Sequence, residues 1–182
     1  MQRYVVILLL FLTTISSAMA DTTDDLIQRV DSIMDNISQI YGKKQARIDF
    51  YKNMAEKSRK PETLLSAYDK LYDEYFVFQF DSAMVYVDKA IQLADRIGDK
   101  YHHDKSRIEK ASLLAVGGLY GEAMGLLGEI DSVKLDDELR FTYTITHYYV
   151  YTYWADYCHD NTYSPRYRER ADSYLKHAVA ML

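Results

Sequence analysis

Apolar residues recur at steps of three and four along most of the chain, which is the spacing of an amphipathic α-helix. After an apolar N-terminal run, one such series contains Leu26, Val30, Ile33, Ile37 and Ile40. Gly42 predicts the end of that helix. Further helices are expected over 43–58, 62–77, 82–97, 100–116, 121–130, 137–158 and 165–181. No segment shows the strict alternation of a strand, so the pattern predicts an all-α protein.

Residues at the expected boundaries fit these limits. Asp81 and Asp136 precede apolar helical series and are expected as N-caps, because a carboxylate accepts hydrogen bonds from free backbone N–H groups. Ser164 followed by Pro165 predicts an N-cap and a proline in the first turn. Gly98 stands where a helix commonly ends in the left-handed conformation.

Three of the expected helices carry the same internal pattern. Each has an alanine, then a larger apolar residue three or four positions later, then a small or apolar residue seven positions later. The alanines are Ala83, Ala123 and Ala171, spaced 40 and 48 residues apart. A weaker copy is centred on Ala46 and Phe50. An alanine at such a position lets one helix pack closely against its partner, and the larger residue fills the gap.

This pattern resembles the second helix of the tetratricopeptide (TPR) repeat. The stretch from Gly118 to Ala123 looks like the turn between the two helices of such a repeat. The chain departs from the family because its spacing exceeds 34 residues and the first-helix Trp and Gly positions are not met. The resemblance implies a TPR-like helical-hairpin solenoid of three to four antiparallel helix pairs. The alternative is a generic helical bundle with alanines in its core.

The N-terminus has the three-part layout of a secretory signal peptide. Arg3 precedes the apolar run from Tyr4 to Leu12, and Ala18 and Ala20 form an Ala-x-Ala site. Cleavage is expected after Ala20, so residues 1–20 are the leader and 21–182 the helical domain, exported to the periplasm. The alternatives are an uncleaved anchor or a buried helix, although the run is short for a membrane span of about 20 residues.

Five segments together are similar to a more specific family. They are Arg47-Ile48-Asp49, residues 68–75, residues 80–83, residues 161–167 and the leader. The family is an exported TPR region of Bacteroidota regulators, followed there by a transmembrane helix and a cytoplasmic DNA-binding region. The resemblance implies the sensory part of a transcription regulator, cut short at Leu182. The alternative is a structural or assembly subunit, or an adaptor, of an envelope complex.

The charge balance narrows the class of partner. Without the leader and its Arg3, 21 basic and 27 acidic residues remain, a formal charge of −6. An acidic module gains nothing from the release of phosphate counterions, so binding of nucleic acid by this segment is disfavoured. The segment 21–182 contains no run apolar enough to span a membrane. The expected partner is a protein or peptide, and the oligomeric state is left open.

The sequence contains no arrangement typical of catalysis. We find no nucleophile motif, no phosphate-binding glycine loop and no histidine or cysteine spacing typical of metal sites. His102-His103-Asp104 is interpreted as a solvated helix start, since adjacent helical side chains do not share a face. We therefore expect neither an enzyme nor a cofactor. The lone Cys158 has no internal disulfide partner, which leaves burial or pairing with another molecule.

Three glycines of the expected helix 121–130 form a further feature. Gly121, Gly125 and Gly128 share one helix face, which predicts close packing of a neighbouring helix or of a ligand.

Helix 137–158 is aromatic all round. It carries Tyr143, Tyr148, Tyr149, Tyr151, Tyr153, Trp154 and Tyr157. Such a helix is either sandwiched between neighbours or leaves one face for a partner. In the TPR family the first helix of each pair lines the concave groove. The candidate partner-binding residues are Tyr143, His147, Tyr148, Tyr151 and Trp154.

Overall fold

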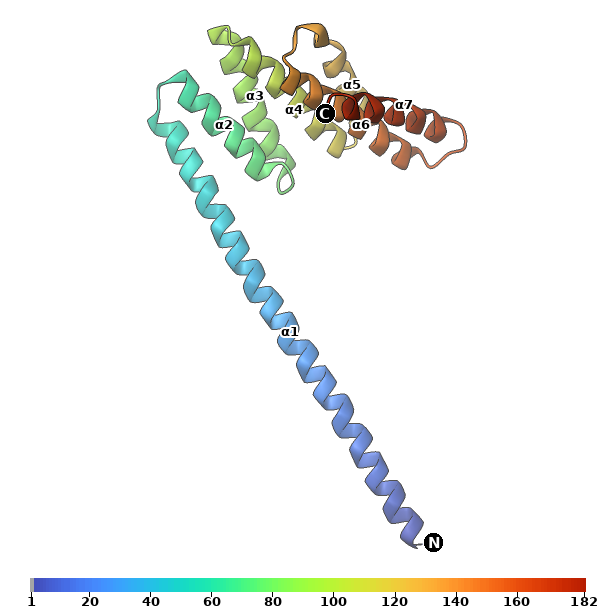
Figure 1. The fold of residues 1–182 in the computed structure, drawn as a ribbon. Coiled ribbons are helices and arrows are strands. Elements are labelled where there is room, and N and C mark those ends of the chain that lie inside the picture. Colours follow the sequence, from blue (N-terminus) through green and yellow to red (C-terminus); the bar gives the residue numbers. More distant parts are fainter. Residues whose placement is uncertain (1) are drawn as a thin grey trace. The chain divides into compact units, whose positions relative to one another are not determined.

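The computed structural model describes the backbone from Gln2 to Leu182 and the side chains from Thr23 onward (Figure 1). Within this range the chain forms seven α-helices and one short 3-10 helix, with no strand. It divides into two compact units, Met1–Ala46 and Arg47–Leu182. The all-α prediction is confirmed.

The first helix, α1 (Gln2–Lys57), passes through both units. The predicted break at Gly42 is wrong, because the helix continues through this residue. A glycine inside a helix costs only about 1 kcal/mol relative to alanine. The following Lys43, Lys44 and Gln45 favour the helix, and nothing lies within 4 Å of a Cβ at Gly42. The expected leader peptide and its cleavage after Ala20 lie outside the described side chains.

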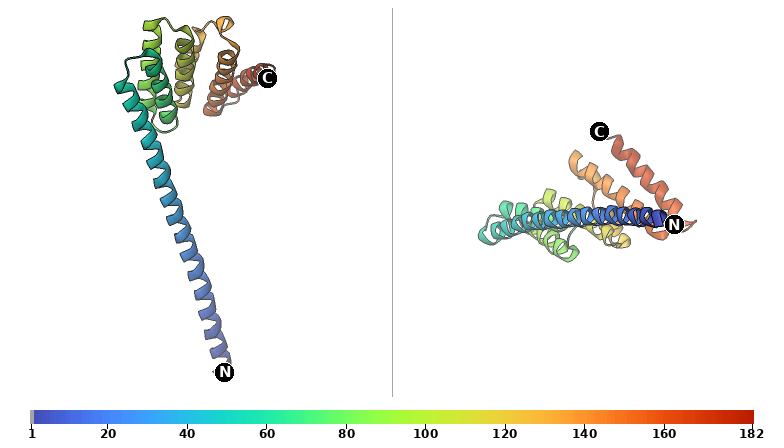
Figure 2. Two further views of the ribbon diagram at one scale, coloured as in Figure 1. Left: turned by 60° about the vertical axis from the view of Figure 1, so that its left-hand side comes forward. Right: turned by 90° about the horizontal axis from the view of Figure 1, so that it is seen from below.

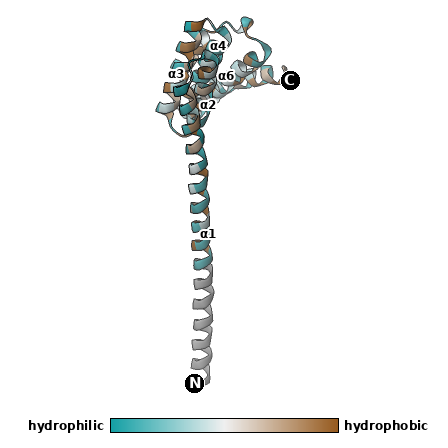
Figure 3. Ribbon diagram, turned by 90° about the vertical axis from the view of Figure 1, so that its left-hand side faces the viewer, coloured by the Kyte–Doolittle hydropathy of each residue, from teal (hydrophilic) through white to brown (hydrophobic). Residues whose placement is uncertain are grey.

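The apolar series of α1 is exposed in the described part of this helix. It comprises Leu26, Val30, Ile33, Ile37 and Ile40. Figure 3 shows hydrophobic and hydrophilic residues interleaved along the coloured part of α1. Of the described residues, no helix combines the length and the apolar character needed to cross a membrane.

The remaining helices stack in sequence order (Figure 2). They are α2 (Pro61–Tyr75), α3 (Phe80–Ile97), α4 (Lys100–Val116), α5 (Tyr120–Gly128), η1 (Ser132–Lys134), α6 (Asp137–Cys158) and α7 (Tyr163–Val179). The helices α2 and α3, α4 and α5, and α6 and α7 form successive pairs. In addition, α4 packs against α3 and α6. The arrangement is the predicted TPR-like solenoid of helical hairpins.

The caps agree with the sequence at two positions. Gly98 ends α3 in the left-handed conformation, with φ 72°. The Asp136 carboxylate accepts a hydrogen bond of 2.8 Å from the Leu139 N–H at the start of α6. The end of α3 and the start of α6 therefore fall where local chemistry places them.

Two predicted caps are wrong. The N-cap of α3 is Gln79, and Asp81 lies in the first turn, where its charge still favours the helix dipole. The Ser164 hydroxyl donates instead to the Ala155 carbonyl oxygen at 2.8 Å, and joins α7 to α6. The Asp160 carboxylate takes over the capping role by accepting from the Tyr163 N–H. The Ser164 side chain thus makes a tertiary hydrogen bond in place of the local cap that the sequence predicted.

The repeat alanines lie in the core. Ala83, Ala123 and Ala171 are buried, as are the following Val87 and Leu127. This burial confirms the packing role that the repeat predicts for them. The weaker copy is wrong, because Ala46 and Phe50 are both exposed.

The end of α1 instead contributes Ile48 to the core. This side chain is buried and packs with Leu71, Tyr72 and Tyr75 of α2. The residues 47–57 therefore cover the first helical pair of the unit Arg47–Leu182.

The predicted close packing at the α5 glycines is also wrong. A Cβ at Gly121, Gly125 or Gly128 would meet nothing within 4 Å. The helix buries the opposite stripe, Ala123 and Leu127, so the glycines face away from the core.

Candidate partner-binding surface

Helix α6 has two packed faces and one open face. Leu139 and Val150 belong to a buried cluster shared with α4 and α5. A second face carries His147 and Tyr151 and packs against α7. The third face is open. The aromatic helix is therefore sandwiched between neighbours on two faces and leaves the third face for a partner, so each of the two predicted interpretations holds for a part of it.

His147 lies inside the α6–α7 contact, with 3% of its surface exposed. Its ring stacks on Tyr174 with centroids 4.5 Å apart, and Tyr143 meets it edge-on at 4.6 Å. Neither ring nitrogen of His147 has a hydrogen-bond partner. Burial disfavours the charged imidazolium, and lowers the pKa of His147 to about 4. The ring is therefore neutral near pH 7 and belongs to the packing between the helices.

Beside this contact the two helices form a pocket of about 430 Å³. We call it the arginine–aromatic pocket, lined by Met124, Tyr151, Trp154, Tyr163, Arg166, Tyr167 and Arg170. The Trp154 and Tyr167 rings stack with centroids 4.4 Å apart and planes 17° apart. Trp154 also stacks on Tyr120 of α5, at 5.7 Å. The aromatic wall of the pocket thus comes from α6 and α7, and Trp154 also packs against α5.

The open face of α6 carries Tyr148, Tyr149 and Tyr153, which we call the tyrosine face. Tyr149 and Tyr153 are 44% and 39% exposed, and Tyr148 is half-buried. Their rings form a continuous series, with centroid distances of 5.1 Å between Tyr148 and Tyr149 and 6.0 Å between Tyr149 and Tyr153. Tyr153 also lines a second pocket, of about 390 Å³, with Tyr120 and Tyr157.

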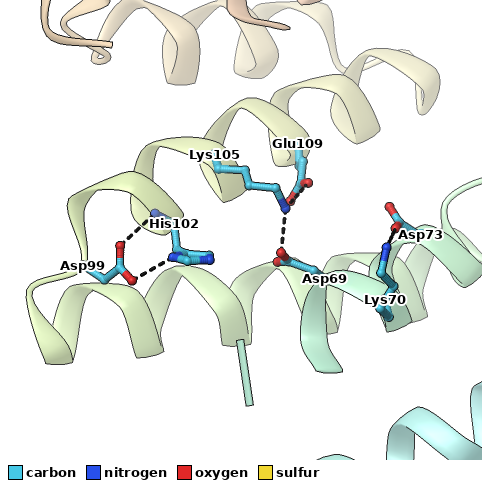
Figure 4. A network of polar contacts seen from close by, with 7 residues as sticks. All are labelled: Asp69, Lys70, Asp73, Asp99, His102, Lys105 and Glu109. Atoms are coloured by element: carbon cyan, nitrogen blue, oxygen red, sulfur yellow. Dashed lines mark hydrogen bonds and ion pairs between the residues drawn. The ribbon is translucent and has the colours of Figure 1, made fainter. Parts of the chain in front are cut away.

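A polar groove of about 490 Å³ lies between α2 and α4 (Figure 4). The Lys105 ammonium stands between two carboxylates, 2.6 Å from Asp69 of α2 and 2.8 Å from Glu109 of its own helix. At one end of the groove the His102 ring contacts the Asp99 carboxylate at 2.7 Å. Figure 4 shows Lys105 pointing toward Asp69 across the groove. An ion-paired seam therefore joins the first helices of two successive pairs.

Burial shapes the acid–base behaviour of this seam. Removal from water raises the pKa of Glu109 to about 7, against the opposing pull of Lys105. The two carboxylates raise the pKa of the Lys105 ammonium above its ordinary value and outweigh its own desolvation. Lys105 is therefore cationic at every physiological pH, while Glu109 gains a proton near neutrality.

Sequence reasoning missed this groove. Lys105 and Glu109 are four positions apart on one helix, a spacing that indicates an ion pair. Asp69 lies 36 residues away and only the fold brings it to Lys105.

Sequence analysis placed His102, His103 and Asp104 at a solvated helix start. This is wrong for Asp104, which is buried and pairs with Lys100 at 2.9 Å. The N-cap of α4 is Asp99, the partner of His102.

The five predicted site residues are divided by the structure. Tyr143, His147 and Tyr151 gather around Tyr174 in the α6–α7 contact. The remaining two are Trp154, on the wall of the arginine–aromatic pocket, and Tyr148, on the tyrosine face. The structure adds Tyr149 and Tyr153, which are more exposed than any of the five. Cys158, on the last turn of α6, is a half-buried free thiol.

Most of the chain matches a known protein family. The family described as the SusR N-terminal TPR domain matches residues 34–182. The chain belongs to this family. No curated protein matches the chain. The SusR-type TPR domain explains the paired helices and the buried repeat alanines, and confirms the resemblance drawn from the sequence.

The family also defines a coarse role. Helical-repeat domains of this kind are protein-interaction folds, whose stacked helices present extended binding surfaces. The SusR N-terminal TPR match therefore supports a protein-binding helical module.

Proposed function

We propose that this chain is an exported protein- or peptide-binding module and the sensory part of a signalling and transcription-regulatory protein. The tyrosine face is the observation that carries the proposal. Tyr149 and Tyr153 stay exposed on a helix whose other two faces are packed. Tyrosine offers a partner a large apolar ring and a polar hydroxyl at small entropic cost, which is why it is enriched in binding surfaces.

The surroundings of this face support a peptide as the partner. Trp154 lies between Tyr120 and Tyr167 and lines the arginine–aromatic pocket, while Tyr153 lines the second pocket. Each pocket has the volume of a few side chains. A segment that lies across α6 would find apolar pockets for its side chains.

The predicted site residues take two roles in this proposal. Tyr148 and Trp154 contact the partner directly. Tyr143, His147 and Tyr151 hold α7 against α6, and so keep the walls of the arginine–aromatic pocket in place.

The export and regulatory parts of the proposal rest on the sequence. The leader layout of residues 1–20 supports export, and the resemblance to membrane-anchored regulators supports a sensory role. Under this proposal, partner capture on the helical domain is reported to a regulatory region of the same protein.

A peptide selection with matched variants tests the proposal. A displayed library of random peptides would be selected on the wild-type chain, and the recovered peptides measured against Tyr149→Ala/Tyr153→Ala. We expect affinity to fall at least about tenfold, since aromatic anchors commonly carry most of the binding energy. Phe50→Ala removes another exposed aromatic residue, on α1, and is the control. Equal affinity of all three proteins would reject the tyrosine face as the binding surface.

One observation favours a second candidate, a structural or assembly subunit of an envelope complex. The apolar series of α1 from Leu26 to Ile40 is exposed, as in a static helix interface. Under this candidate, Ile33→Asp would abolish a stable association that survives high salt during purification. A sensor would lose none of its peptide affinity through the same change.

A further inference from the structure

Two arginines of the arginine–aromatic pocket have no acidic partner. Arg166 and Arg170 form no ion pair with any carboxylate of the described residues. Arg168 lies between them in sequence and pairs with Asp156 at 2.8 Å. Acidic residues outnumber basic ones in this chain, 27 to 22. A shortage of carboxylates therefore does not explain why Arg166 and Arg170 lack an ion pair.

Each of these two exposed arginines contacts an aromatic ring. The Arg170 guanidinium lies 5.5 Å from the centre of the Tyr151 ring and donates to its hydroxyl at 3.0 Å. Tyr151 is itself buried, so Arg170 is anchored to the core. Arg166 lies 5.9 Å from the centre of the Tyr163 ring. Because the Tyr151 hydroxyl holds the Arg170 guanidinium, this side chain loses less conformational entropy than an unconstrained arginine when an anion binds.

The rest of the pocket is apolar. Its wall is the stacked pair Trp154 and Tyr167, with Met124 of α5 beside it. Flat aromatic walls and a polarisable methionine suit an aliphatic or aromatic side chain. The pocket therefore places two cationic donors at the edge of an apolar surface.

We propose that this pocket binds an acidic peptide segment, with the carboxylate of a Glu or Asp on Arg166 and Arg170 and an adjacent apolar side chain on Trp154. The inference rests on the proposed peptide-binding function and names its chemistry. Guanidinium groups match carboxylates in shape and charge, and each such charge-assisted hydrogen bond is stronger than a neutral one. A basic segment would meet two uncompensated positive charges here.

The net charge of the chain favours an isolated carboxylate over a polyanion. The formal charge is −5, so a nucleic acid or a sulfated polysaccharide is repelled at long range. A short peptide with one or two acidic residues carries little charge at distance. It meets the local positive charge only when it reaches the pocket.

A pair of labelled peptides tests the inference. The probe is fluorescein-Gly-Glu-Phe-Glu-Leu-Gly-amide, and its match carries Gln in place of both Glu residues. The amide removes the terminal carboxylate and the anionic fluorescein is common to both peptides, so the two differ only in their side-chain acids. Affinity is measured by fluorescence anisotropy for the wild type, Arg166→Gln, and Arg166→Gln/Arg170→Gln. The control is Arg59→Gln/Arg96→Gln, which removes two other arginines that have no ion pair among the described residues.

We expect the wild type to bind the Glu peptide at least about tenfold more tightly than the Gln peptide, and the double variant to lose this preference. Because Arg170 contacts a buried tyrosine, the melting temperature of each variant is recorded. Arg166→Gln removes no contact with a buried residue, and is expected to lose part of the preference with an unchanged melting temperature.

Three results would overturn the inference. The first is equal affinity for the two peptides, and the second is no measurable binding of the Glu peptide. The third is a preference for the Glu peptide that survives both variants. If selected peptides still depend on Tyr149 and Tyr153 while the arginine variants change nothing, the binding function stands and only the acidic specificity fails.

Discussion

The rings of His147 and Tyr174 lie parallel, with 3° between their planes and 4.5 Å between their centroids. This stack joins α6 to α7 through a titratable side chain with no hydrogen-bond partner on either nitrogen. Protonation would place an unpaired charge among aromatic rings, which is costly. The contact between the last two helices is therefore built for a neutral imidazole.

The His147 stack predicts a loss of stability in mild acid. The folded-state pKa of about 4 lies below the ordinary 6.5, so the unfolded chain binds the proton first. The neutral His147 ring therefore makes its full contribution to the free energy of unfolding above pH 6.5. This contribution declines as the pH falls toward 4, by roughly 3 kcal/mol in total. His147→Phe keeps the stacking and removes the titration. We expect urea unfolding of this variant to depend less on pH between 6.5 and 4. An unchanged pH profile would contradict the burial of a neutral ring.

Tyr151 and Tyr149 are expected to separate stability from binding. Tyr151 is 5% exposed, and Tyr151→Ala should lower the free energy of unfolding by about 3 kcal/mol through the cavity it leaves. Tyr149 is on the open face, and Tyr149→Ala should change stability by less than about 0.5 kcal/mol. Denaturant unfolding measures both. A large loss for Tyr149→Ala would show that the tyrosine face is covered by the protein itself.

Lys105 should matter more than its neighbour Lys110. Lys105→Met leaves Asp69 and Glu109 facing each other without a cation, and we expect a loss of about 2 kcal/mol at pH 8. The loss should shrink as the pH falls to 5, because the raised pKa of Glu109 lets the folded state take up the proton that relieves the repulsion. Lys110 pairs with Asp88 alone in a more exposed position, so Lys110→Met should cost about 0.5 kcal/mol or less. Equal losses of stability for the two variants would show that the ion pairs of Lys105 do not hold α2 to α4.

Two glycines should respond to alanine with opposite sign. Gly125 lies within α5 with space around it, and Gly125→Ala should stabilise the protein by about 0.5–1 kcal/mol. Gly98 has a positive φ of 72°, so Gly98→Ala should destabilise it by about 1 kcal/mol. The difference in melting temperature between the two variants measures this contrast. A destabilising Gly125→Ala would show that a partner or ligand needs the bare face of α5.

The sequence alone determined the helical class, the repeat and most helix limits. These properties depend on neighbours within one helix or on spacing along the chain. The repeated pattern of an alanine followed by a larger apolar residue, as in Ala83 and Val87, predicted that Ala83, Ala123 and Ala171 lie in the core. Asp136 and Gly98 marked helix ends because capping needs only local backbone groups. The seven glycines were less informative, since Gly42 and Gly125 sit inside helices that their neighbours stabilise.

The tertiary structure decided which aromatic residues are available. All of the α6 tyrosines look alike in sequence, and helical spacing gives no hint of which face meets α4, α5 or α7. Packing buried His147 and Tyr151 and left Tyr149 and Tyr153 open. It also brought Lys105 to Asp69 and placed Arg166 and Arg170 around Trp154. Periodicity fixes the faces of a single helix, whereas a binding surface depends on which of those faces the neighbouring helices leave uncovered.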